Sequence, residues 1–329
     1  FDNAKSFSDG LAAIEKDKKW GFINTSGEVV IPVDYDKVKY YNSGLAVVLK
    51  DDVWHYINKS GTKVETPVSD KYFDFNDGVA FYKANDKIGL IGSDGKVILE
   101  PTYDNIKKFR NGYAKVKQGD LWGMIDKTGK LVIPAEYTAI GNELTASGVD
   151  ARKGESFGII SDGTFHVIEG ADKVWGFKGD GKLAYARKEK KIGFVNSNGE
   201  WVIQPAFDKA RAFVDGLAPV ANEKKWGYIN ENGEMTIAAS YRDAEIFSEG
   251  LAPVKEKKWG FIDKTGKLII PMEYDITAGF AFLAGKDTKG FTNGLARVKS
   301  KKGWGFFDTS GNLLGNKWFE NAEPFVTIK

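Results

Sequence analysis

Hydrophobic and polar positions alternate in blocks along this chain. Short apolar runs, such as Leu251–Val254, Trp259–Ile262 and Leu268–Ile270, are separated by polar segments rich in Lys, Asp, Asn and Gly. Runs of this length are too short for a stable helix, and their β-branched and aromatic residues are typical of strands. The pattern predicts short antiparallel strands joined by tight turns.

The three runs recur along the chain at a nearly constant spacing. A bulky apolar residue, usually followed by Gly, marks the second run, and the steps between successive markers are 34, 34, 34, 35, 35, 34, 33 and 45 residues. The nine markers are Trp20, Trp54, Ile88, Trp122, Phe157, Ile192, Trp226, Trp259 and Trp304. A fixed period outweighs any local motif in predicting a fold. It predicts a single array over residues 1–329, regular over 1–140 and 191–329, degenerate over 141–190, and carrying an insertion near 276–290.

Turn residues punctuate each repeat at fixed positions. In eight of the nine repeats a Gly follows the marker by seven residues, and such a Gly suits a hairpin loop that closes at positive φ. Asp or Asn at the start of the loop is expected to bond the loop backbone. An Ile-Pro pair such as Ile31-Pro32 is expected to end strand pairing, because Pro has no donor. A connector such as Ala210 to Phe213, at most one helical turn, then leads to the next repeat.

These elements predict an all-β fold. We expect a tandem repeat of about nine three-stranded antiparallel β-meander units, arranged as an open β-solenoid or superhelix, with a β-propeller as the alternative. Two observations favour the open form. The same connector stands at both ends of the chain, at 1–7 and 319–325, whereas a closed ring shares one blade between its ends. A repeat of this length is also short for a four-stranded blade.

The repeated Lys-Trp-Gly-Phe-Ile runs at Lys19–Ile23 and Lys258–Ile262, with their flanking Gly-Leu-Ala and Asp-Lys-Thr-Gly-Lys-Leu segments, resemble the bacterial WG (KWG) repeat family. The resemblance covers nearly the whole chain. It implies a binding or scaffold module and supplies no catalytic residues. The chain departs from the pattern where His55 replaces the marker Gly, and where Ile88, Phe157 and Ile192 replace Trp.

Composition excludes several classes of protein. The net charge of +2, from 47 basic and 45 acidic side chains, argues against a general nucleic-acid binder. No apolar run is long enough for a membrane span. The absence of Cys excludes disulfides and thiol chemistry, and it is compatible with an extracytoplasmic location: secreted, periplasmic or at the cell surface. A start at Phe1 is expected of a processed or trimmed chain.

Lysines recur in one phase at the predicted hairpin tips, so stacking of the repeats would align them in a stripe. This candidate binding surface comprises Lys19, Lys191, Lys225, Lys258 and Lys302. It could attract an anionic polymer such as an acidic glycan. The alternative, which we favour, is solvated turn lysines that keep strand edges from pairing, partly neutralised by nearby acids.

The marker tryptophans could form an exposed ladder for sugars or a buried spine between repeats. Replacement by Ile at two markers fits burial, and a ring beside Gly suits packing over backbone. Trp175 is out of phase and is interpreted as a chance match. Trp201 and Trp318, also out of phase, are better candidates for an exposed aromatic, and Phe280 and Phe282 in the insertion join Trp201 in the candidate binding surface.

Candidate chemistry is sparse. The two histidines, His55 and His166, lie about three repeats apart and suggest no metal or catalytic site. Acids in the degenerate stretch, Asp150, Glu155 and Asp162, are the basis of a minor alternative, a cell-wall-directed hydrolase. We expect no catalytic, cofactor or metal residues. The sequence therefore predicts a non-enzymatic binding or scaffold protein that presents an extended surface to a protein or cell-envelope polymer, with a structural or self-assembling surface protein as the alternative.

Overall fold

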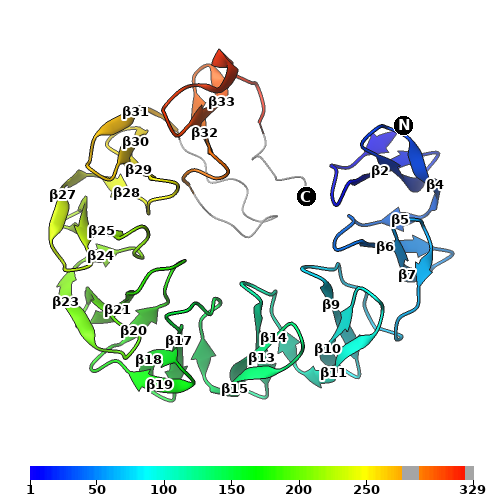
Figure 1. Cartoon of the computed structure of the whole chain (residues 1–329), viewed down its shortest axis with the longest axis horizontal. Coiled ribbons are helices and arrows are strands. Elements are labelled where there is room, and N and C mark those ends of the chain that lie inside the picture. The colour runs from blue at the N-terminus through cyan, green and yellow to red at the C-terminus, as the bar shows by residue number, and fades with distance from the viewer. Residues whose placement is uncertain (276–288, 323–329) are drawn as a thin grey trace. The chain divides into compact units, whose positions relative to one another are not determined.

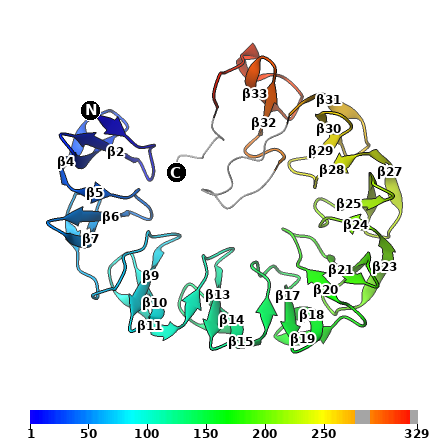
Figure 2. The same cartoon turned by 180° about the vertical axis from the view of Figure 1, so that it is seen from behind.

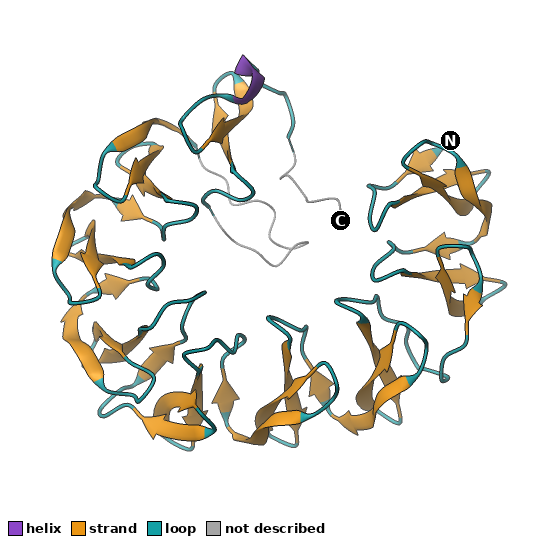
Figure 3. Cartoon of the chain, viewed as in Figure 1, coloured by secondary structure: helices purple, strands orange, loops and turns teal. Residues whose placement is uncertain are grey.

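A computed structural model describes residues 1–275 and 289–322 of the chain. Almost all regular structure in these residues is strand (Figure 3), and a single 3₁₀ turn, η1 (Leu314–Asn316), is the one helical element among them. Contacts between residues divide the chain near Thr138 into two compact bodies. The N-terminal body holds repeats one to four and the C-terminal body repeats five to nine, and each is described by itself (Figures 1 and 2).

The N-terminal body contains four sheets in chain order. Their strands are β1 (Asn3–Ala4), β2 (Leu11–Lys16), β3 (Lys19–Asn24) and β4 (Val29–Tyr35); β5 (Lys37–Val38), β6 (Leu45–Lys50), β7 (Val53–Asn58) and β8 (Lys63–Val64); β9 (Val79–Ala84), β10 (Lys87–Gly92) and β11 (Val97–Tyr103); β12 (Asn105–Ile106), β13 (Tyr113–Gln118), β14 (Leu121–Asp126) and β15 (Leu131–Tyr137).

The C-terminal body contains five sheets. Their strands are β16 (Ala139–Ile140), β17 (Val149–Lys153), β18 (Ser156–Ser161) and β19 (Thr164–Val167); β20 (Lys173–Trp175), β21 (Ala184–Lys188), β22 (Lys191–Val195) and β23 (Trp201–Phe207); β24 (Lys209–Ala210), β25 (Leu217–Asn222), β26 (Lys225–Asn230) and β27 (Met235–Tyr241); β28 (Asp243–Ala244), β29 (Leu251–Lys255), β30 (Trp259–Asp263) and β31 (Leu268–Tyr274); β32 (Leu295–Ser300) and β33 (Gly303–Asp308).

The tandem all-β repeat is confirmed, with one strand more than predicted in most repeats. Over the described residues seven of the nine sheets have four antiparallel strands, because the connector adds a two- or three-residue strand before the meander. Lys37 and Val38, for example, pair with Leu49 and Val48, and no helical turn forms there. The expectation of three strands was therefore wrong, and a repeat of this length does hold four. The open solenoid stays a prediction.

We expected the Ile-Pro pair to end strand pairing, but it lies inside the third long strand. Trp20 pairs with Tyr35 and Phe22 with Ile31, so three residues of β4 face the single Gly21 in a bulge. A proline can occupy this bulge because the ladder needs no donor there. The bulge also explains the marker glycine. A Cβ on Gly21 would lie 2.6 Å from the carbonyl oxygen of Ile31.

The replacement of the marker Gly by His55 is explained by the same geometry. In the second repeat the third long strand is only the two-residue β8, which pairs with Tyr56 and Ile57 and continues no further toward His55. No crossing backbone therefore occupies the space beside the marker, and a side chain larger than Gly fits.

The turn predictions are confirmed. The loop glycines have positive φ, for example 83° at Gly27, 79° at Gly129 and 84° at Gly233. The loop begins with an Asx turn, in which the side-chain oxygen of Asn24 accepts bonds from the backbone N–H groups of Ser26 and Glu28.

The core lies between successive sheets and depends on a position that the sequence analysis did not single out. The residue two places after the marker is fully buried, as at Phe22, Tyr228 and Phe261. It meets the connector aromatic of the next repeat edge to face: Phe22 with Tyr41 at 4.7 Å and Tyr228 with Phe247 at 5.2 Å between ring centroids. Each repeat is thus completed by its neighbour.

Candidate binding surface

The lysines at the hairpin tips are paired with acids of the same repeat. Lys19 lies 2.6 Å from Asp36, and the same pairing recurs between Lys191 and Asp208 and between Lys258 and Asp275, each at 2.6 Å. The acid is the one that follows the aromatic residue at the end of the third strand. The bulge brings it back beside the tip, which sequence spacing alone did not show.

The same carboxylates also bind the tip of the next repeat. Asp36 accepts a bond from the backbone N–H of Asp51, and Asp208 accepts one from Glu223. Lys191 and then the backbone N–H of Glu223 lower the pKa of Asp208. Lys19 likewise lowers the pKa of Asp36. The tip lysines are therefore paired with acids that also bond the next repeat, and they are not an unopposed basic stripe.

Two lysines of the predicted stripe depart from this pattern. Lys225 donates to the carbonyl oxygen of Ser240 at 2.7 Å, because no acid occupies the equivalent position. Lys302 lies in an exposed turn. In its hairpin Gly303, and not Lys302, occupies the position that Lys19 has in the first repeat. The five lysines therefore do not share one equivalent set of contacts.

Basic side chains from the connectors cover four of the marker tryptophans: Trp20, Trp122, Trp226 and Trp259. Lys5 lies 4.7 Å from the ring centroid of Trp20, and Arg211 lies 4.5 Å from that of Trp226. Trp226 and Trp259 are each only 7% exposed, whereas Trp20 is half-buried. The covered face of each ring leaves no room for a sugar to stack there.

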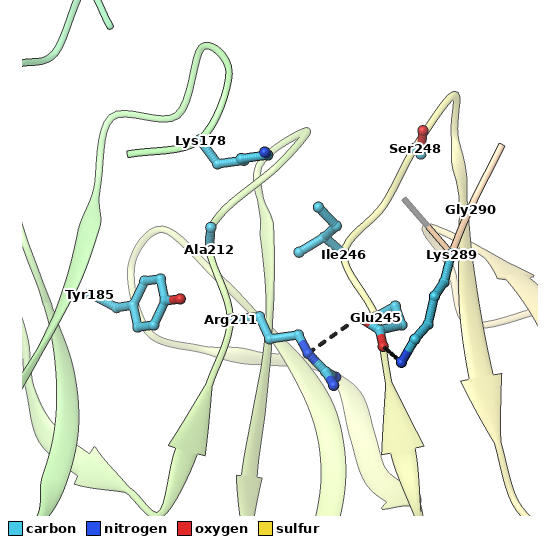
Figure 4. Close-up of a pocket in the computed structure, with 9 residues that line it drawn as sticks. All are labelled: Lys178, Tyr185, Arg211, Ala212, Glu245, Ile246, Ser248, Lys289 and Gly290. Carbon is cyan, nitrogen blue, oxygen red and sulfur yellow. Dashed lines mark hydrogen bonds and ion pairs between the residues drawn. The ribbon is translucent and has the colours of Figure 1, made fainter. Parts of the chain in front are cut away.

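A hollow of about 290 Å³ opens among the connectors of the C-terminal body (Figure 4). Four consecutive repeats line it, through Lys178 and Tyr185, then Arg211 and Ala212, then Glu245, Ile246 and Ser248, and finally Lys289 and Gly290. Its volume is at the lower end of the range for small-molecule sites, so it suits one side chain or one sugar-sized group.

Glu245 is the centre of the charge network in this hollow. Its carboxylate lies 2.6 Å from Lys289 and 3.3 Å from Nε of Arg211, as the dashed lines in Figure 4 show. Arg211 also pairs with Asp243 at 3.0 Å and donates to the Ala244 carbonyl. Lys178 extends from the facing loop, with Glu143 at 4.0 Å. Burial raises the pKa of the Tyr185 phenol, so this group stays protonated.

A second hollow of about 380 Å³ adjoins the first through Arg211. It is lined by Ile192, Lys209, Ala210, Arg211, Trp226, Arg242 and Asp243. The two hollows share Arg211, and repeats six to nine supply their lining, which has charges of both signs and apolar side chains. We call the two hollows together the connector groove. A basic residue in the second connector position (Lys5, Lys39, Lys107, Arg211) was the sequence signal that could have indicated it.

The two tryptophans that were predicted to be exposed do not line the connector groove. Trp201 is half-buried, packs against the core shared by repeats five and six, and donates from Nε1 to the carbonyl oxygen of Glu169 at 3.1 Å. Trp318 is half-buried and stacks on Tyr274. Trp175, the out-of-phase match, belongs to the short first strand β20 and stacks on Tyr185 at 4.8 Å. Phe280 and Phe282 lie outside the described residues.

The acids of the minor hydrolase alternative do not converge. Glu155 lies in the turn before β18, where it pairs with Arg152, and Asp162 lies just beyond the other end of that strand. A six-residue strand spans about 20 Å, whereas paired glycosidase carboxylates lie within about 10 Å of each other. Asp150 is the second residue of β17, opposite Ile159.

Neither histidine belongs to a cluster of possible metal ligands. His55 lies near the Tyr35 ring and His166 pairs with Ile159 in the fifth sheet. Within residues 1–275 and 289–322, no group of three or more His, Cys, Asp or Glu side chains could hold a metal ion. That part of the chain also contains no helix of the length and hydrophobicity needed to cross a membrane.

Two solved structures that match this chain are distant likenesses. A eukaryotic initiation factor is 12% identical with a TM-score of 0.41, covering 82% of this chain and 86% of that one. PorZ, a bacterial surface component of the type-IX secretion system of Porphyromonas gingivalis, is 10% identical with a TM-score of 0.27, covering 94% of this chain and 51% of that one. At these TM-scores the likenesses carry no argument about arrangement or function. A search of curated proteins gave no match.

The family comparison agrees with the sequence pattern. The model of the WG containing repeat matches residues 1–20, 20–54, 56–87, 88–122, 122–143, 192–226, 226–258 and 259–281. The matches cover more than half of the chain, and they leave out most of the stretch described above as degenerate, 141–190. With its repeated Trp-Gly marker, its bulged third strand and these matches, the chain belongs to the WG containing repeat family.

Proposed function

We propose that this chain is a non-enzymatic binding or scaffold protein, and that its connector groove is the binding surface. The observation that carries the proposal is the convergence of side chains from four consecutive repeats on one hollow. Extended repeat arrays bind through surfaces of this kind, built from equivalent positions of neighbouring repeats. The absence of Cys motivates the further proposal of an extracytoplasmic location.

The chemistry of the groove favours a protein partner over an anionic polymer. Arg211 and Lys289 share the carboxylate of Glu245, and Ile246 and Ala212 add apolar surface beside them. A lining with both signs of charge and apolar side chains fits a polypeptide, which offers all three kinds of contact. The paired hairpin lysines also leave little unbalanced charge to attract a polyanion at the tips.

The proposal is tested by changing the groove without changing the fold. Lys178→Glu reverses a half-exposed charge at the rim of the groove. Lys190→Glu, at the exposed tip between β21 and β22, makes the same change of net charge outside the groove. The purified full chain and both variants are titrated with acidic and neutral glycan arrays, a teichoic-acid polymer and envelope proteins of the source cell.

The expected result is a protein ligand whose affinity falls about ten-fold with Lys178→Glu and is unchanged with Lys190→Glu. Equal effects of the two variants on every ligand would refute the groove as the binding surface. Tight binding of the polymer alone would replace the protein partner. Hydrolysis of a bound polymer that is lost in an Asp150→Asn, Asp162→Asn double variant would refute the non-enzymatic role.

A further inference from the structure

One charged position, directly after the third long strand, is reversed in the seventh repeat. In four other repeats an aspartate follows the last aromatic residue of this strand and lies 2.5–2.6 Å from the lysine at the hairpin tip: Asp36, Asp104, Asp208 and Asp275. In the seventh repeat Arg242 occupies this position, directly after Tyr241. The exchange of Asp for Arg changes the charge at this place by two units.

The reversal leaves the seventh hairpin tip without a hydrogen-bonded carboxylate. Lys225 donates instead to the carbonyl oxygen of Ser240 at 2.7 Å. Of the residues that the structure describes, Glu256 is the one acid within ion-pair distance of Lys225 or Arg242, at 3.9 and 4.0 Å respectively. Both distances are too long for a hydrogen bond. The side chain of Arg242 is 66% exposed, so its guanidinium donors are open to a ligand.

Arg242 lines the second hollow of the connector groove together with two more cations. Lys209 belongs to β24, and Arg211 directly follows that strand. Asp243 is the only acid among the described residues of this lining, and it pairs with Arg211 at 3.0 Å. The ammonium group of Lys209 makes no hydrogen bond or ion pair with the described parts of the chain. The lining therefore has three cations against one acid, and Lys209 and Arg242 keep their donors free for a ligand.

We propose that the second hollow binds an acidic side chain, Asp or Glu, of the protein partner, and that Arg242 selects it. This inference rests on the proposed function, since it names the part of the partner that the groove recognises. A guanidinium matches a carboxylate in geometry, because two of its N–H groups can donate to the two oxygens. Ile192 and Ala210, which also line the hollow, can pack against the methylene groups of the bound side chain. Where its sister repeats carry a carboxylate of their own, the seventh repeat receives one from outside the chain.

The first hollow favours a single acidic side chain over a polyanion as the ligand. Glu245 lies in that hollow between Lys289 at 2.6 Å and Arg211 at 3.3 Å (Figure 4). A polymer with a negative charge on every unit would bring one of its charges toward this carboxylate, and like charges repel. A polypeptide can place an acid in the second hollow and an apolar side chain beside Ile246 in the first.

A library of random displayed peptides tests the inference, because it offers every kind of side chain to the groove. The library is selected on the immobilised full chain, and the dissociation constants of the enriched peptides are then measured by fluorescence anisotropy. We expect each enriched peptide to contain an Asp or Glu whose replacement by the corresponding amide raises the dissociation constant about ten-fold.

Arg242→Asp is the matched variant, because it gives the seventh repeat the residue that Asp36 and Asp208 provide in theirs. The variant should therefore fold and melt like the parent chain, and it should raise the dissociation constant of the acidic peptide at least about ten-fold. Lys18→Asp, at the exposed tip between β2 and β3, changes the net charge by the same two units outside the groove and should leave the affinity unchanged. Should Arg242→Asp fail to fold, Lys209→Gln removes another cation of the hollow and should also weaken binding of the acidic peptide.

Changing the chain and the peptide together locates the acid. Arg242→Gln in the chain and the acid-to-amide change in the peptide should each raise the dissociation constant about ten-fold. Because the two groups contact each other, both changes together should cost no more than about ten-fold. A combined loss of about a hundred-fold would mean that the acid binds elsewhere, and it would overturn the inference.

The outcomes separate this inference from the proposed function on which it rests. Enriched peptides that contain no acid, and that Lys178→Glu weakens but Arg242→Asp does not, would overturn the inference and leave the groove as a protein-binding surface. No enriched peptide, or peptides that neither variant weakens, would contradict the proposed function as well. Binding of acidic glycans alone, lost with Arg242→Asp, would replace the acidic side chain by a polymer as the ligand of this hollow.

Discussion

At the scale of single residues, the marker glycine is required by the backbone that crosses it. A Cβ on Gly123 would lie 2.5 Å from the Ile133 carbonyl oxygen, a distance that real contacts do not reach. The clash is with backbone, so a side-chain movement cannot relieve it. We therefore expect Gly123→Ala to destabilise the N-terminal body by at least about 2 kcal/mol, measured by urea denaturation.

The second repeat provides the matched control for this prediction. His55 already occupies the marker glycine's place beside the short strand β8, with no crossing carbonyl above it. His55→Ala should therefore change stability by less than about 0.5 kcal/mol. Similar losses from His55→Ala and Gly123→Ala would show that the bulge does not explain the glycine.

A second prediction at this scale concerns the buried residue two places after the marker. Burial raises the pKa of Tyr228, which stays protonated and donates to the carbonyl oxygen of Glu245 at 2.9 Å. Sister repeats place Phe22 or Phe261 at the same position. Tyr228→Phe should keep the ring packing, lose this one hydrogen bond and cost about 1 kcal/mol. Tyr228→Ala should cost about 3–5 kcal/mol, because it also removes the ring. Equal losses of stability from the two variants, measured by calorimetry, would show that the ring packing contributes nothing beyond the hydroxyl.

At the scale of elements, the lysine–aspartate contacts at the hairpin tips predict a dependence of stability on pH. The side chain of Lys87, and then the backbone N–H of Gly119, lower the pKa of Asp104. A carboxylate with a lowered folded-state pKa stabilises the fold above its unfolded pKa of about 4, and this contribution is lost as pH falls through the folded value.

The measurement is the free energy of unfolding of the parent and of Asp104→Asn from neutral to acid pH. At neutral pH the variant should be the less stable of the two, because the asparagine cannot form the charged pair. The difference should shrink as pH falls below about 4. A difference that stays constant over this range would show that the charge of Asp104 does not stabilise the tip.

The sequence predicted those features of the elements that depend on neighbouring residues. The alternation of apolar runs indicated the strands, and Gly27 and Gly129 indicated turns with positive φ, because both follow from local sterics. The bulge was missed, since Pro32 read alone indicates a strand end. The fourth strand was missed because Lys37-Val38 is too short to show a period.

The candidate site was less predictable because it depends on residues from different repeats. The lysines at the tips and the acids at the strand ends were each visible in the sequence, but only the bulge brings Lys19 to Asp36. Likewise, Arg211 and Glu245 belong to successive repeats and meet only because successive connectors are neighbours in space. Periodicity indicates that equivalent residues align but not which non-equivalent ones make contact.

At the scale of the whole molecule, the structural repeat persists where the sequence repeat is weak. The stretch 141–190 is largely unmatched by the family model, yet its residues form β17 to β21 in sheets with the usual strand order. The core clusters join neighbouring repeats within each body, as where Phe194 of the sixth repeat packs against Phe213 of the seventh. Stability should therefore be a sum of local terms with nearest-neighbour coupling.

The marker tryptophans test this nearest-neighbour picture. Trp226 is buried in a cluster that includes Ala244 and Phe247 of the following repeat, whereas Trp175 is half-buried and stacks mainly on Tyr185. Trp226→Ala should cost roughly 3–5 kcal/mol, and hydrogen exchange should show lost protection in repeats six to eight while repeats one to four keep theirs. Trp175→Ala should cost far less. Equal loss from both, or loss spread over the whole chain, would show that the repeats do not couple through their phased markers.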